Sequence, residues 1–189
     1  LSNQKFSYGF GSEYKYDWGH YLTKTFSSQT KGHLSNLGIF VNAGYKINEN
    51  LALSLHGRND DHKETGGNQT YKINFTQLIG SLKLGVTHST GLKNASLYEL
   101  YGNIGQKHID PEKSETNEII GEYSFSENIK LISTAYRTRM KDRIKIKSNW
   151  SAYENKKTDT TQEGLESEIT FIGKNQQISI NSHFAKSRS

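Results

Sequence analysis

The chain has 189 residues, only 32% of them hydrophobic, and its mean hydropathy is -0.79. This composition argues against a globular domain with a large dry core, while 11 Tyr, 8 Phe, 2 Trp and 17 Gly argue against disorder. The chain has no Cys, which excludes disulfides and thiolate metal sites, and its net charge of +5 is too scattered to indicate nucleic-acid binding.

Apolar residues alternate with polar or small ones along most of the chain, beginning with Phe6, Tyr8 and Phe10. The same period of two returns at 37–46, 51–56, 81–86 and 178–184, and it predicts β-strands. The fold class expected is all-β, an antiparallel meander. About nine strands are expected, near residues 5–16, 33–46, 51–60, 69–77, 80–89, 115–125, 129–148, 151–172 and 176–186.

The connections between these strands are of two kinds. Short turns are expected at 48–50, 78–80, 126–128 and 173–175, and long polar segments at 17–33, 60–69, 90–114 and 141–160. Alternation alone fits a soluble sandwich as well as an outer-membrane barrel. A meander with short turns at one end and long loops at the other is typical of a transmembrane β-barrel of the bacterial outer membrane.

Other sequence features bear on the membrane and on the number of strands. No apolar run approaches the roughly 20 residues of a membrane-spanning helix, and no signal peptide begins the chain. Bacterial single-chain barrels have even strand numbers, so about nine strands indicate a segment of a larger barrel. The alternative is a small complete outer-membrane barrel acting as a passive pore or adhesin, which the odd number disfavours.

Five short motifs, in order, resemble those of TonB-dependent outer-membrane receptors. "ASLYELYG" at 95–102 is similar to that family's "APSLxELYG", although Pro is absent before Ser96. The other matches are "GRNDDHKETGG" at 57–67, with Thr65 where Phe is usual, "DPEKSETNE" at 110–118, "YRTRMKDRI" at 136–144, and the set Tyr153, Asn155, Gly164, Glu166 and Glu168. "QKHI" at 106–109 replaces the family's "NPNL".

This resemblance implies a 22-stranded barrel whose lumen is filled by a separate plug. Residues 1–189 would then be a C-terminal-half portion of the barrel, with the plug domain and the closing strands absent. The implied function is TonB-dependent active uptake of a large scarce nutrient, cobalamin or a ferric siderophore, with no enzymatic activity and no cofactor. The implied partners are outer-membrane lipid and lipopolysaccharide, the plug, TonB through the plug, and the nutrient.

The stretch 95–103 gathers Leu97, Tyr98, Leu100 and Tyr101 in a polar chain and has two readings. The leucines and one tyrosine could form a small core that folds this loop onto its neighbours. Alternatively, Tyr98 or Tyr101 could offer an amphipathic ring to a large ligand. The candidate ligand-binding residues on the expected loops are Trp18, His20, Tyr98, Tyr101, His108, Trp150 and Tyr153. The aromatic residues of 17–21 and 149–153 could instead belong to an aromatic belt at the membrane boundary.

The remaining polar clusters indicate a metal site or an anion site only weakly. Asp60, Asp61, His62 and Glu64 could offer oxygen ligands to Ca²⁺, but they lack the spacing of a calcium loop, so no metal is expected. Lys141, Arg143, Lys145 and Lys147 alternate along a long loop and could meet lipopolysaccharide phosphates or an anionic ligand; a solvated loop arm is the other reading.

Two further clusters argue against alternative functions. His108 lies within the replaced "NPNL", which argues against a haem receptor. The consecutive Asn181, Ser182 and His183 suggest an outer-membrane lipase, but on a strand Ser182 points away from the other two.

Overall fold

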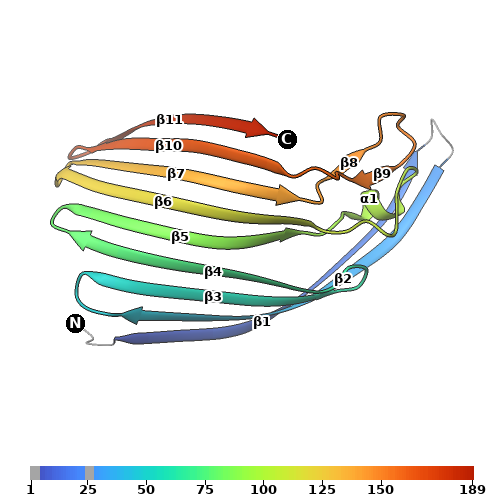
Figure 1. The fold of residues 1–189 in the computed structure, drawn as a ribbon, viewed down its shortest axis with the longest axis horizontal. Helices are drawn as coiled ribbons and strands as arrows, with labels where there is room; N and C mark the ends of the chain where they lie inside the picture. Colours follow the sequence, from blue (N-terminus) through green and yellow to red (C-terminus); the bar gives the residue numbers. More distant parts are fainter. Residues whose placement is uncertain (1–4, 24–27) are drawn as a thin grey trace.

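The computed structural model describes residues 5–23 and 28–189, and its main element is one antiparallel sheet of nine strands (Figure 1). The strands follow one another in chain order, from β1 at one edge to β11 at the other. They are β1 (Phe6–Thr23), β2 (Ser28–Lys46), β3 (Leu51–His62), β4 (Gly66–Ile79), β5 (Leu82–Lys93), β6 (Glu112–Ser126), β7 (Ile129–Lys141), β10 (Thr160–Ile172) and β11 (Gln177–Arg188). The predicted all-β antiparallel meander of nine strands is confirmed.

Two of the expected long loops are largely strand. The pairing of β1 with β2 continues to Thr23 opposite Ser28, so most of 17–33 is a hairpin arm that extends the sheet. That segment was wrongly predicted because its polar residues suggested a loop, yet the alternation of Tyr14, Tyr16 and Trp18 carries on through it. Segment 60–69 is likewise mostly strand, since only residues 63–65 separate β3 from β4.

The long segments at 90–114 and 141–160 are confirmed as connections, but each contains its own structure. The first holds the helix α1 (Leu97–Tyr101), where only a loop was expected. The second holds the small hairpin of β8 (Ile144–Ile146) and β9 (Tyr153–Asn155), so the single strands predicted at 129–148 and 151–172 are wrong in extent. Asp142, at φ 54°, lies between β7 and β8. The short turns are confirmed, although the one expected at 78–80 is centred on Gly80, at φ 57°.

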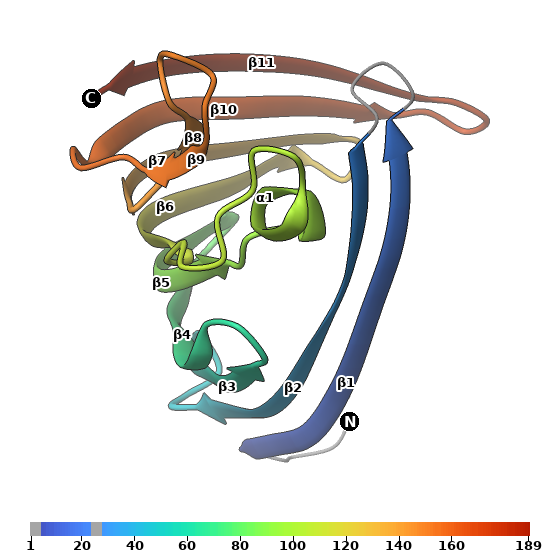
Figure 2. The ribbon, with the colours of Figure 1, turned by 90° about the vertical axis from the view of Figure 1, so that its right-hand side faces the viewer.

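The sheet is strongly curved, and α1 with the β8–β9 hairpin lies inside the curve (Figure 2). Side chains of alternate residues therefore separate into a convex face and a concave face. Large apolar side chains gather on the convex face, where Phe10 is 82% exposed and Phe184 is 73% exposed. One cross-strand row there runs through Phe75, Val86, Ile119, Ala135, Leu165 and Phe184. An apolar face left open in this way is suited to lipid rather than water.

The concave face is polar and held together by hydrogen bonds. Arg58 of β3 donates to both carboxylate oxygens of Asp60 at 2.8 Å and to Glu13 of β1, also at 2.8 Å. Asn36 of β2 donates to Asp60 at 2.6 Å, so three strands are tied together across this face. A charged network on the inner wall is what an aqueous or plugged lumen accepts.

The apolar core is small and lies at one end of the sheet, called here the loop end because α1 and the β8–β9 hairpin are there. It consists of Leu34, Ala95, Leu100 and Ile109, each at most 6% exposed. No helix among the described residues is long and apolar enough to cross a membrane. Because the four core residues lie at the loop end, the apolar core organises the loops rather than holding the sheet together.

Candidate functional site

Helix α1 is a rigid element at the loop end because both of its termini are satisfied. The amide of Glu99 donates to Ser96 Oγ at 3.3 Å, and the Ser96 amide donates to the Glu99 carboxylate at 2.7 Å, which is a capping box. At the other end the Gly102 amide donates to the Tyr98 carbonyl at 2.9 Å. Leu100, which is 2% exposed, anchors the helix to Leu34 of β2.

Tyr101 fastens α1 to two neighbouring strand ends. Its ring packs on Gly32 of β2, where a Cβ atom would approach the ring to 2.6 Å. Its hydroxyl donates to the Glu64 carboxylate in the turn between β3 and β4. Burial, and then the hydrogen bond to Glu64, raise the pKa of Tyr101 to about 12. The tyrosine is therefore a neutral structural anchor at physiological pH.

The β8–β9 hairpin completes the cap over the core. Ile144 and Tyr153 pack against the buried cluster, and the Tyr153 amide donates to the Ile104 carbonyl at 3.0 Å. The Asn155 side chain donates to the carbonyls of Asp110 and Asp142, at 2.9 and 2.7 Å. Burial raises the pKa of Tyr153 as well. Two loops distant in sequence are thus joined into one body.

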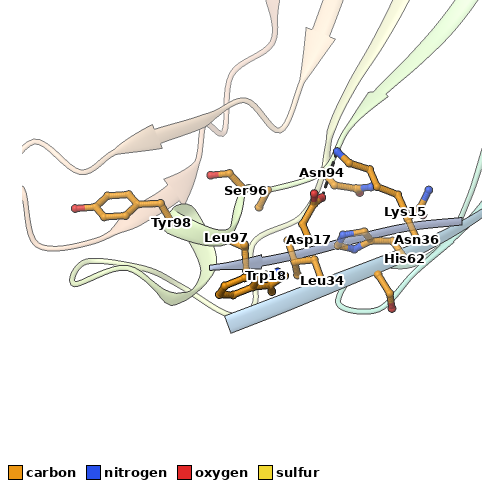
Figure 3. A pocket seen from close by; sticks show the side chains of 12 residues that line it. Lys15, Asp17, Trp18, Leu34, Asn36, His62, Asn94, Ser96, Leu97 and Tyr98 are labelled. Carbon is orange, nitrogen blue, oxygen red and sulfur yellow. Dashed lines mark ion pairs between the residues drawn. The ribbon is translucent and has the colours of Figure 1, made fainter. Parts of the chain in front are cut away.

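A hollow of about 570 Å³ lies between this cap and the β1–β2 arm (Figure 3). It is lined by Lys15, Asp17, Trp18, Leu34, Ser35, Asn36, His62, Asn94, Ala95, Ser96, Leu97 and Tyr98. Lys15 and Asp17 form an ion pair at 3.2 Å, and Tyr98 lies at the opposite side of the hollow in Figure 3. Its lining combines aromatic, amide and charged groups in one place, which is the composition of a site for a polar ligand with apolar parts.

The structure brings some of the predicted binding residues together. Trp18 and Tyr98 both line the hollow and are 74% and 44% exposed. The rings of Tyr98 and Tyr153 meet edge to face with centroids 6.4 Å apart. Tyr101 is the tyrosine that joins Leu97 and Leu100 in the small core, so Tyr98 is the ring left available to a ligand.

The other predicted residues lie apart from the hollow. His20 is exposed on β1, next to Gln29 of β2, and is therefore on a strand rather than a loop. His108 is exposed in the connection between α1 and β6. Trp150 is 73% exposed beyond β8, at φ 57°, a backbone conformation that costs energy for a bulky residue.

Several structural roles of residues at this site were not predicted from the sequence. Ser96 and Glu99 have the Ser-x-x-Glu spacing of a capping box, which would have indicated the helix. The turn between β3 and β4 is joined to the segment around α1 by two contacts: Glu64 accepts from the Tyr101 hydroxyl, and Thr65 Oγ1 donates to Asn94 at 2.9 Å. Within the turn, Thr65 Oγ1 lies 3.1 Å from His62 Nδ1. No local sequence signal predicts such contacts between segments.

The clusters considered for metal binding or catalysis do not converge in the described part of the chain. Asp60 faces the concave side and is engaged by Arg58, whereas Asp61 pairs with Leu37 on the other face. No group of three or more His, Asp or Glu side chains in residues 5–23 and 28–189 is arranged to hold a metal ion. Ser182 is paired with Ser167, and His183 with Glu166 on the opposite face.

Comparison with known proteins gives a consistent picture. The family model "TonB dependent receptor-like, beta-barrel" matches residues 2–176. The fold is similar to the siderophore receptor PirA from Pseudomonas aeruginosa (TM-score 0.80, 19% identity, 96% of this chain and 37% of that chain). It is also similar to a mutant of the ferric enterobactin receptor PfeA from the same organism in complex with enterobactin (0.80, 18%, 96% and 33%). A third similar structure is the iron transporter FrpB from Neisseria meningitidis (0.74, 13%, 100% and 34%). The chain spans about a third of the length of these proteins.

Proposed function

Because this chain belongs to the family of TonB-dependent receptor-like β-barrels, we propose that it forms part of the wall and mouth of a bacterial outer-membrane receptor. The receptor takes up a large scarce nutrient actively, and this portion contributes binding rather than chemistry. No enzymatic role is proposed. The loop end faces the outside of the cell, since long loops of such barrels are extracellular and short turns periplasmic.

The nutrient we propose is a ferric siderophore, with cobalamin as the second ligand class that the motifs suggest. Similarity to structures of siderophore receptors supports the first choice. The hollow supports a ligand of this kind because its lining offers aromatic rings beside charged and amide groups. We take Tyr98 as the contact residue, with Tyr153 supporting its ring. Trp18 borders the hollow but shares the strand parity of Tyr14, so its side chain belongs to the convex face.

The remaining partners follow from the two faces of the sheet. The polar concave face, with its network around Arg58, suits a plug domain in the lumen, and TonB would act through that plug. The apolar convex face suits outer-membrane lipid, including lipopolysaccharide.

The single observation that carries the proposal is the hollow beside a rigid, capped α1 at the loop end. The test is uptake of a labelled ferric siderophore, and separately of labelled cobalamin, by cells producing the full-length receptor with and without a proton motive force. Tyr98→Ala should weaken binding about tenfold, as loss of one aromatic contact does. Tyr14→Ala is the matched control, since Tyr14 is exposed on the convex face of the same arm. If these cells take up neither nutrient above background, the proposal is overturned.

A further inference from the structure

Cations gather on the convex face of the sheet toward the loop end. In the register of β5, β6 and β7, the row Leu92, Lys113 and Lys141 lies above the row Thr90, Glu115 and Arg139. These rows have the same parity as Val86, Ile119 and Ala135, so their side chains point away from the lumen. The nutrient hollow is on the other face and does not use them.

Lys113 and Lys141 are direct cross-strand partners. Like charges placed opposite each other destabilise a strand pair unless something compensates them. In the described part of the chain, the nearby arginines are compensated: Arg139 pairs with Asp159, and Arg137 with Glu163 at 3.4 Å. Neither Lys113 nor Lys141 has an acidic partner within 4.0 Å there, so an anion from outside the chain would relieve their repulsion.

These lysines border a groove of about 480 Å³. Lys113, Arg139 and Lys141 line it together with Glu115. Since Arg139 already pairs with Asp159, the two lysines are the cations of this groove that lack an acidic partner among the described residues. Gly67 lines the same groove and leaves open space where a Cβ would be. The shape and charge favour a compact polyanionic group, and phosphate fits this description because lysine ammonium and guanidinium groups bind it with charge-assisted hydrogen bonds.

An apolar groove of about 640 Å³ adjoins it toward the turn end. Its floor is Ala135, which is flanked in register by the larger Ile119 and Leu165. His88, Asn117 and Arg137 line its upper rim, one row below Thr90, Glu115 and Arg139. The two grooves therefore lie one after the other on a path along this face, from a cationic patch to an apolar groove.

The height of this path matches a lipid bilayer. β7 has 13 residues, so Lys141 at its end lies about 30 Å above the short turns for a rise of about 3.3 Å per residue and a tilt of about 40°. Ala135 is then at about half that height. The apolar band of such barrels is about 25 Å tall, which puts the lysine pair at its outer boundary, where headgroups are.

We propose that this convex surface is a specific site for a phosphorylated lipid of the outer leaflet. The headgroup phosphate lies between Lys113 and Lys141, with Arg139 beside it, and an acyl chain lies over Ala135 between Ile119 and Leu165. The inference rests on the proposed outer-membrane location and on none of the nutrient contacts.

The test uses the full-length receptor in detergent, with the affinity for bisphosphorylated lipid A measured by native mass spectrometry. Lys113→Ala with Lys141→Ala should weaken binding at least about tenfold, and replacement of both by Arg should retain it. The control is Lys46→Ala with Lys174→Ala, which removes the same charge at the turn end. The affinity of the wild-type receptor for lipid A should fall as the salt concentration rises. Enzymatically dephosphorylated lipid should bind to the wild type as weakly as lipid A binds to the double alanine variant.

Three results would overturn the site: unchanged affinity in the double alanine variant, equal binding of dephosphorylated lipid, or full displacement by millimolar inorganic phosphate, which would indicate a soluble anion instead. Nutrient uptake is measured on the same variants. A wild-type receptor that takes up the nutrient but binds lipid A and dephosphorylated lipid equally refutes this inference alone. A wild-type receptor that binds lipid A selectively but takes up no nutrient refutes the proposed function alone.

Discussion

Leu100→Ala tests whether the capped loop is a separate structural unit. Leu100 is 2% exposed and packs with Leu34, Ala95 and Ile109, so its truncation removes one of the three large side chains of a four-residue core. Leu→Ala changes in cores cost about 2–5 kcal/mol, and a small core at a rim that partly collapses should give the lower figure. About 2 kcal/mol raises the local opening constant about 30-fold.

Hydrogen exchange measures this opening directly. The amides of Gly102 and Gln106, which donate to the carbonyls of Tyr98 and Glu99 at 2.9 Å each, should exchange about 30-fold faster in Leu100→Ala. Strand amides should keep their rates. Leu165→Ala is the control, since Leu165 is 49% exposed on the convex face and contributes nothing to this core. Unchanged rates at Gly102 and Gln106, or equal acceleration of the sheet, would refute the reasoning.

Two further predictions concern charge and pH. Arg58→Gln should lower the free energy of unfolding by about 2 kcal/mol or more in a urea titration, because it leaves the carboxylate of Asp60, which is 8% exposed, without its cation. In the same titration Arg139→Gln should cost under about 1 kcal/mol, because the Arg139 side chain is 56% exposed. Equal costs would contradict the view that the Arg58–Asp60 pair is the buried one. The phenol of Tyr101 should titrate near pH 12 in the difference between wild-type and Tyr101→Phe absorbance at 295 nm. Folding raises the pKa of Tyr101 above the ordinary value of 10.0, so the stability that the protonated phenol contributes is complete below pH 10 and is lost as pH rises toward 12. If the absorbance difference titrates at the ordinary value instead, Tyr101 is not anchored to Glu64.

The sequence by itself was sufficient for the fold class and the strand order. Alternation with a period of two is a local property, and residues such as Leu82, Leu84 and Val86 reveal it without any knowledge of their neighbours in space. The short turns were equally readable, because Gly80 and the Asn-rich segments carry turn chemistry in their own residue types. The five motifs between residues 57 and 168, in their order, were enough to suggest the family.

What only the tertiary structure decided was which polar segments remain strand and which tyrosine is free. The arm at 17–33 is strand because β1 and β2 pair with each other along it, a stabilisation that composition does not express. Tyr98 and Tyr101 have the same chemistry, yet Tyr101 meets Gly32 and Glu64, residues 69 and 37 positions earlier, and Tyr98 is left 44% exposed at the edge of the hollow. Contacts between such distant segments depend on how the sheet curves and where its loops fold back, and no pattern along the chain encodes that locally.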